Sequence, residues 1–185
     1  GVVDVDCALT IDPTGVQKPV IRAIAQLVDV TGSSVYFRYP VTKINGRLEF
    51  DGTKILLRNL MGHVSGGTVV FSGEVTPHVG GAAVDLAVIG RAVELTAEYL
   101  KAFPPEATAI FQEYSIQGGM ADAIWKFHRP IGPDVKPEHH LTVTFTNVSA
   151  RWKGFPYPLK SVSGRLEWSP GNVTLSAMKG TGPDG

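Results

Sequence analysis

One stretch decides the fold, Tyr39-Pro40-Val41-Thr42-Lys43-Ile44-Asn45-Gly46-Arg47-Leu48-Glu49-Phe50, because it returns as Tyr157-Pro158-Leu159-Lys160-Ser161-Val162-Ser163-Gly164-Arg165-Leu166-Glu167-Trp168. Residues 1–67 can be laid over residues 119–185 at a constant offset of 118, without a gap. A self-match of this kind indicates repeated structural units. We therefore expect a window from an array, and a natural protein longer than these 185 residues.

Apolar and polar residues alternate within this stretch. Ile44, Leu48 and Phe50 fall on one side of an extended strand, and the residues between them are polar. Strands with one polar face are typical of antiparallel sheets. Turn residues such as Asp51-Gly52 and Pro170-Gly171 separate the apolar segments at short intervals. The pattern predicts a mostly β fold, a curved antiparallel sheet of gutter or groove shape built of repeats.

The helical signal is concentrated at residues 93–115. Apolar residues recur there at helical spacing, Pro104-Pro105 interrupts them, and Gly118-Gly119 follow. We expect a kinked helical pair, and hence a first β segment at 1–92, a helical connector at 93–118 and a second β segment at 119–185. Residues 16–27 also suit a short helix, but the repeat equates residues 20–28 with a strand, which we favour.

Composition excludes several classes of function. The chain has 17 basic and 17 acidic residues, interspersed, so no positive field is available to attract nucleic acid. Cys7, the single cysteine, cannot form an internal disulfide. No apolar run approaches the roughly 18 residues of a membrane span, and no signal peptide is present.

No motif points to catalysis, a metal or a cofactor. His139-His140 is the one histidine pair, but neighbouring residues of a strand point to opposite faces and cannot converge on one ion. A nucleophilic serine elbow and a glycine-rich phosphate loop are both missing from the sequence. We therefore predict a protein that is not an enzyme, with no catalytic residue, no metal site and no cofactor.

Gly46 and its equivalent Gly164 stand in the middle of predicted strands. A glycine there usually marks a bulge, a bend or the close approach of another group. We favour curvature of the sheet.

The apolar face is the remaining candidate for function. Its predicted members are Ile44, Leu48, Phe50, Val69, Phe71, Leu141, Val143, Phe145, Val162, Leu166, Trp168, Val173 and Leu175. In a closed sandwich this face would be core. In an open sheet it would be a lipid-sized groove, where each buried methylene of an acyl chain gains about 0.8 kcal/mol.

Two segments resemble the repeating unit of the bacterial AsmA-like and TamB-like envelope proteins. They run from Phe155-Pro156-Tyr157-Pro158-Leu159 to Gly180-Thr181-Gly182, and from Tyr39-Pro40 to the Ser-Gly-Gly of residues 65–67 and the apolar strand that follows. The likeness covers roughly residues 29–76 and 141–185, and its motifs specify strands and turns rather than chemistry.

This resemblance implies a long curved sheet with an apolar concave face that contacts phospholipid or other acyl lipid. It implies a periplasmic or cell-envelope location, a parent chain anchored in the inner membrane, and a role in lipid transport between membranes or in outer-membrane biogenesis. The implied partners are further repeats of the parent chain and other envelope proteins. The alternative is a structural or adhesive β-repeat module that binds protein or glycan through its edges and loops, with Ile44, Leu48 and Leu166 covered by protein.

Overall fold

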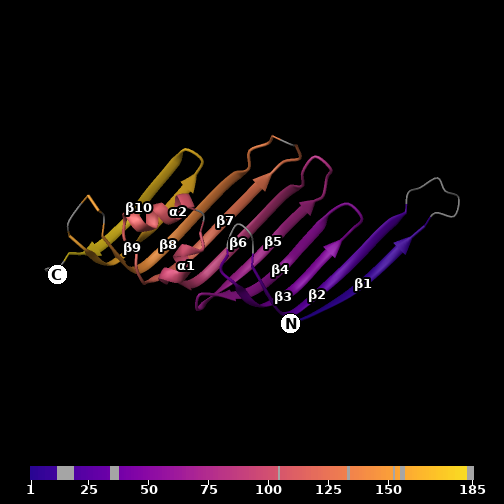
Figure 1. The fold of residues 1–185 in the computed structure, drawn as a ribbon, viewed down its shortest axis with the longest axis horizontal. Coiled ribbons are helices and arrows are strands. Elements are labelled where there is room, and N and C mark those ends of the chain that lie inside the picture. Colours follow the sequence, from indigo (N-terminus) through magenta and orange to yellow (C-terminus); the bar gives the residue numbers. More distant parts are fainter. Residues whose placement is uncertain are drawn as a thin grey trace.

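Ten strands in the described part of the chain form one antiparallel sheet, in which each strand pairs with its neighbours in sequence (Figure 1). The structure is a computed structural model that describes residues 1–11, 19–33, 38–103, 105–132, 134–151, 153–154 and 157–182, without the side chains of 105–107 and 110. The sheet is neither closed nor strongly curled. The predicted mostly β, antiparallel architecture is thus confirmed.

The elements follow one another as a meander with two helices inserted after the sixth strand. In chain order they are β1 (Val2–Thr10), β2 (Val20–Gly32), β3 (Val41–Phe50), β4 (Ile55–Val64), β5 (Gly67–Thr76), β6 (Ala83–Glu94), α1 (Ala97–Lys101), α2 (Pro105–Glu113), β7 (Met120–Arg129), β8 (Glu138–Ala150), β9 (Leu159–Ser169) and β10 (Asn172–Thr181). The strand favoured at residues 20–28 is confirmed as part of β2.

The sequence repeat is also a structural repeat. Strands β1 to β4 match β7 to β10 at the offset of 118, and the pairing registers agree: Val3 faces Leu27 across β1 and β2, as Ala121 faces Phe145 across β7 and β8. Strands β5 and β6 and both helices lie between the two four-strand units. The chain therefore contains a repeated length of sheet.

Most strands carry a β-bulge at a matched position. Asp29, Lys43 and Asn59 have positive φ in β2, β3 and β4, and each stands at a shift in pairing register. Their equivalents in β8, β9 and β10 also have positive φ and stand at a shift in pairing register; they are Asn147, Ser161 and Ala177. A bulge inserts one residue and so puts apolar residues three apart on the same face. Leu27 and Val30 in β2 are one such pair.

The hairpin between β3 and β4 shows why the tips form where they do. The Asp51 carboxylate accepts hydrogen bonds from the backbone N–H of Thr53 (2.9 Å), the hydroxyl of Thr53 (2.8 Å) and the backbone N–H of Lys54 (2.9 Å). An aspartate that bonds to the backbone ahead of it stabilises a tight turn. The predicted tip at Asp51-Gly52 is confirmed.

The helical pair is present but begins later than residue 93. Val93 and Glu94 still belong to β6, where Val93 is buried against the neighbouring strands. Thr96 caps α1 by accepting the backbone N–H of Tyr99 (3.2 Å), and Pro105 opens α2 at a position where a missing N–H costs nothing. Pro104 lies outside the described residues. The apolar spacing at 93–95 reflected a strand end, not a helix.

The sheet has no second layer of strands over it within the described chain. The accessible surface is 12228 Å², whereas a compact protein of 19.8 kDa has about 8,600 Å². Among the described side chains, nine hydrophobic residues are buried, at 4–8% exposure, and no large side chain is completely enclosed. The fold therefore leaves an unusually large area of sheet open.

Candidate apolar binding face

All thirteen predicted residues lie on one face of the sheet, which we call the apolar face. Direct cross-strand partners share a face, and one row of partners crosses six strands from β5 to β10. That row consists of Phe71, Val88, Trp125, Leu141, Trp168 and Val173. Parallel rows pair Leu48 with Leu57, Val143 with Leu166, Leu166 with Leu175, and Val148 with Val162. The alternation read from the sequence is thus confirmed as a continuous surface.

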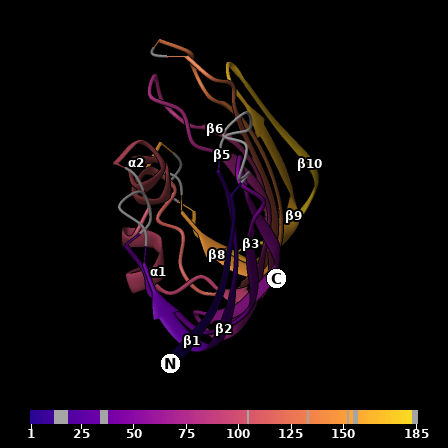
Figure 2. The same ribbon diagram turned by 90° about the vertical axis from the view of Figure 1, so that its right-hand side faces the viewer.

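Helix α1 covers one end of the apolar face. Tyr99 packs there against a cluster formed by Val41, Val64, Val69 and Val93, which are 4–8% exposed. Ile44 and Phe71 contact the same cluster. Figure 2 shows both helices on the same side of the sheet. Four of the candidates are therefore partly or wholly covered by protein: Ile44, Val69 and Phe71 at this cluster, and Val162 of β9, which is 5% exposed.

A chain of aromatic rings continues this cover. Tyr99 meets Tyr39 edge-on at 5.3 Å between ring centroids and Phe103 at 5.2 Å, and Phe103 meets Phe111 of α2 at 5.4 Å. Burial, with the nearby Tyr39 as a lesser cause, raises the pKa of Tyr99 to about 12. Edge-to-face contacts of this kind fix the orientation of rings. The helices are held against the sheet by packing that includes residues ahead of β3.

The opposite end of the apolar face is open and aromatic. His139 of β8 lies among Trp125 (5.9 Å between centroids), Phe127 (5.0 Å) and Trp168 (5.9 Å). Burial in this aromatic surrounding lowers the pKa of His139. Trp168 is 36% exposed, and Val173 and Leu175 of β10 are 58% and 56% exposed. Large apolar side chains are therefore accessible here.

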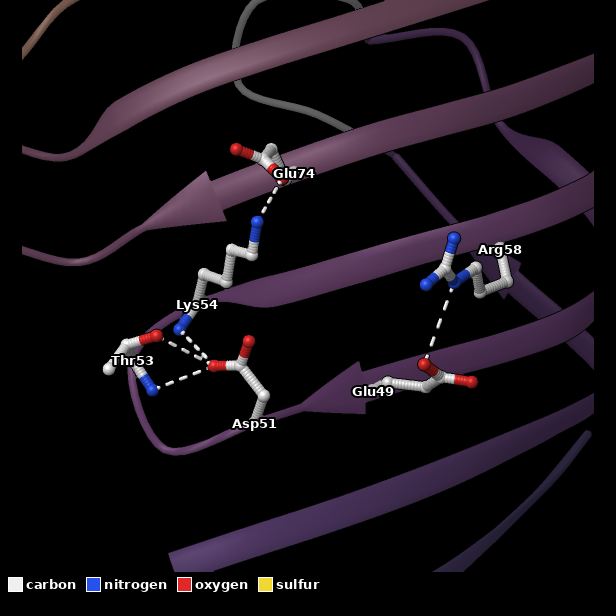
Figure 3. Close-up of polar contacts among 6 residues, drawn as sticks. All are labelled: Glu49, Asp51, Thr53, Lys54, Arg58 and Glu74. Carbon is white, nitrogen blue, oxygen red and sulfur yellow. Dashed lines mark hydrogen bonds and ion pairs between the residues drawn. The ribbon is translucent and has the colours of Figure 1, made fainter. Parts of the chain in front are cut away.

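The other face of the sheet is mixed in character. It carries ion pairs, which Figure 3 shows near the β3–β4 hairpin, and also a row of apolar cross-strand partners, Met61, Val70, Ile89 and Ile124. Lys54 lies 2.7 Å from a carboxylate oxygen of Glu74, and Glu49 lies 2.9 Å from Arg47 and 3.5 Å from Arg58. These pairs are exposed, so each contributes about 0–1 kcal/mol. They keep the hairpin end of this face in contact with water. The apolar face, which carries the aromatic residues Trp125, Phe127 and Trp168, is therefore the stronger candidate for an apolar ligand.

Gly46 and Gly164 mark a close approach between strands. A Cβ on Gly46 would lie 2.9 Å from the Cα of Leu60, and a Cβ on Gly164 would lie 3.3 Å from the Cα of Met178. Leu60 and Met178 are equivalent in the repeat, and each follows the bulge of the adjacent strand. These glycines therefore make room for the bulged neighbour, which is a more specific role than general curvature.

His139 and His140 point to opposite faces, as expected for adjacent residues of a strand. Among the described residues, no group of three His, Cys, Asp or Glu side chains could hold a metal ion.

Within the described segments, each helix is too short or too polar to cross a membrane.

The sequence prediction missed the contribution of β7 to the apolar face. Trp125 and Phe127 complete the aromatic end together with His139, and Val88 of β6 joins the row to Phe71. The repeat contained the signal, because Trp125 and Phe127 are the equivalents of Cys7 and Leu9, which alternate on the apolar side of β1. The sequence argued against a metal site at His139, and it did not predict the position of this side chain among the aromatic rings.

Comparison of this chain with protein-family models, with curated proteins and with solved structures finds no match.

Proposed function

We propose that this chain is a section of an AsmA-like or TamB-like cell-envelope protein whose apolar face holds the acyl chains of phospholipids. The role is non-enzymatic: the sheet shelters lipid tails during transport between membranes or during outer-membrane biogenesis. The observation that carries the proposal is that thirteen apolar residues, eleven from the two repeats and two from β5, lie on one face of a single-layered sheet.

The exposed surface supports a binding partner. The chain exposes about 3,600 Å² more total surface than a compact protein of its mass, and part of it is apolar, because Trp168, Val173 and Leu175 are 36%, 58% and 56% exposed. Contiguous exposed apolar surface marks an interaction site. A 16-carbon acyl chain that was fully buried would gain roughly 13 kcal/mol. An open face covers one side of the chain and so supplies roughly half of that, which suits a surface that must also release its lipid.

The shape of the proposed site follows from its two ends. Helix α1 closes the end near Val64 and Val69, and the aromatic end around Trp168 stays open. Lipid tails enter from the aromatic end and lie along the strands, and further repeats extend the face into a gutter. In this proposal the parent chain is periplasmic, anchored in the inner membrane, and works with other envelope proteins.

The competing function is a structural or adhesive module that binds protein or glycan through its edges and loops. One observation favours it: Ile44 packs against the buried cluster beneath α1 and is partly covered by protein, as that hypothesis expects. Leu48 and Leu166 distinguish the two functions, because both are half-buried and neither is enclosed by a second layer of the described chain.

The test is native mass spectrometry of the chain purified from cells with an envelope, together with extraction and identification of bound lipid. We expect phospholipid to co-purify. The double variant Leu48→Asp, Leu166→Asp places charges on the apolar face and should lose the lipid. The double variant Thr142→Asp, Thr144→Asp adds the same charges to the polar face of β8 and should keep it. Lipid-free wild type, or equal lipid content in both variants, contradicts the proposal.

A further inference from the structure

The free edge of β1 repeats an edge that is occupied elsewhere in the same molecule. β1 stands first in the sheet, and its nine residues are all exposed. Its equivalent β7 pairs on that side with β6, from Val84 with Arg129 to Glu94 with Met120. Comparison of the two strands therefore shows what the β1 edge would bind.

One carboxylate bonds to the bulge in the β6–β7 contact. Asp122 of β7 accepts a hydrogen bond from the backbone N–H of Ala92 (2.8 Å), the positive-φ residue at the bulge of β6. Its second oxygen lies 3.2 Å from Arg91. A bulge leaves a backbone N–H outside the regular ladder, and a charged acceptor satisfies it. The backbone hydrogen bond from Ala92 also lowers the pKa of Asp122.

β1 carries the same acceptor in the same setting. Asp4 is the repeat equivalent of Asp122, and it pairs with Gln26 as Asp122 pairs with Thr144. Gly1 lies against the bulge of β2 at Val30, where a Cβ would come within 2.6 Å of the Val30 Cα. Gly119 lies in the same way against the bulge of β8, with a Cβ 2.7 Å from the Asn147 carbonyl oxygen. The backbone of β1 therefore lies against the bulge of β2 in the same way as the backbone of β7 lies against the bulge of β8.

β1 has few of the features that protect an edge strand against pairing. Exposed edge strands usually carry charged residues, above all Lys, or Pro or a bulge; β1 has no Lys, Pro or bulge, and its charged residues are Asp4 and Asp6. Val3 is 51% exposed, whereas its equivalent Ala121, covered by β6, is 5% exposed. An added strand would cover this apolar area.

We propose that the β1 edge binds one strand of the β6 type from a further copy of segment 67–118, with Asp4 accepting the backbone N–H of its bulge. The inference does not depend on lipid binding, since it rests on the β6–β7 contact alone. The copy supplies β5, β6 and both helices, and so it extends the sheet in the register that the molecule already uses.

The test adds a second copy of residues 67–118 directly before Gly1 of the full chain, which reproduces the natural junction of Gly118 with Gly119. Hydrogen exchange then measures the amides of β1 in the extended and original chains. We expect the β1 amides that do not bond to β2 to exchange more than about tenfold slower in the extended chain. Unchanged exchange overturns the proposal, and so does an added segment that stays unfolded.

A variant identifies the contact. Asp4→Ala should lower the melting temperature of the extended chain by about 2–4 °C, because losing one hydrogen bond costs about 1 kcal/mol in a chain of this size. The melting temperature of the original chain should change by less than about 1 °C. Asp6→Ala is the matched control, because its equivalent Ile124 faces Ile89 without a bulge. An equal effect of Asp4→Ala in both chains, or of both variants in the extended chain, refutes the role of Asp4.

Discussion

Replacing Gly46 by alanine tests whether paired bulges determine the spacing of the strands. The new Cβ would lie 2.7 Å from Cδ2 and 2.9 Å from Cα of Leu60 on β4, and Gly46 has a φ of 144°. A side chain could rotate away, but the Cα belongs to the backbone of a strand held on both sides. The strand must therefore shift, or the alanine must adopt a strained backbone.

Both contributions can be assigned a magnitude. A residue with a side chain at such a φ costs about 1–3 kcal/mol, and forcing a methyl group into a packed contact costs about as much. Gly46→Ala should thus lower the free energy of unfolding by about 2–5 kcal/mol. In a chain of this length that corresponds to a fall in melting temperature of roughly 5–15 °C, measurable by circular dichroism or calorimetry.

The repeat supplies the matched control, Gly164→Ala. Its Cβ would collide mainly with the flexible thioether of Met178, its distance to the Met178 Cα is 3.3 Å, and Gly164 does not have a positive φ. The methionine side chain can move, so we expect a loss of about 1 kcal/mol and 2–4 °C. A neutral Gly46→Ala, or a Gly164→Ala that is equally damaging, would refute the reasoning.

Three titrations follow from the structure. The pKa of the Asp51 carboxyl, measured by NMR, should be about 2, below its usual 3.8, chiefly because Lys54 and Thr53 donate hydrogen bonds to it. The stability that the charged carboxylate contributes is present above pH 3.8 and is lost as the pH falls through about 2. Thr53→Val should raise this pKa. Burial lowers the pKa of His139, so protonation favours the unfolded chain and the melting temperature should fall as the pH drops below about 6.5. His139→Phe should remove that part of the fall, and an unchanged pH dependence would contradict it. Ultraviolet absorbance should show one tyrosine ionising at about 12, and Tyr99→Phe should abolish this step.

The sequence was informative where local chemistry and tertiary structure agree. The alternation around Leu48 and Leu166, the tip at Asp51 and the repeat offset predicted strands, hairpins and a shared apolar face, and the structure has them. Each depends on residues close in the chain, or on the repeat itself. The strand at 20–28 was recoverable only because the repeat equated it with β8.

The bulges could not be recognised from alternation alone. Each places apolar residues three positions apart on one face, as Leu57 and Leu60 in β4 and Phe145 and Val148 in β8. That spacing in isolation is also typical of a helix, and it contributed to an expected helix start at 93. A break in the alternation at equivalent positions of both repeats was the signal that could have identified them.

The sequence also could not predict which part of the apolar face is covered by protein. Whether Ile44 meets protein or solvent depends on where α1 packs, which is fixed by contacts between residues more than 50 positions apart, such as Tyr39 with Tyr99. The same holds for His139, whose aromatic surroundings come from β7 and β9. Long-range packing of this kind leaves no local pattern.

The central claim, that the apolar face contacts lipid, is tested most directly by photocrosslinking in cells. A photoreactive amino acid is placed at Leu48 or Leu166 on the apolar face, and at the adjacent Glu49 or Glu167 on the polar face, so that the two repeats provide duplicate pairs. We predict crosslinks to phospholipid from Leu48 and Leu166 and few from Glu49 and Glu167. Equal labelling from both faces, or crosslinks from the apolar face to protein alone, would contradict the account.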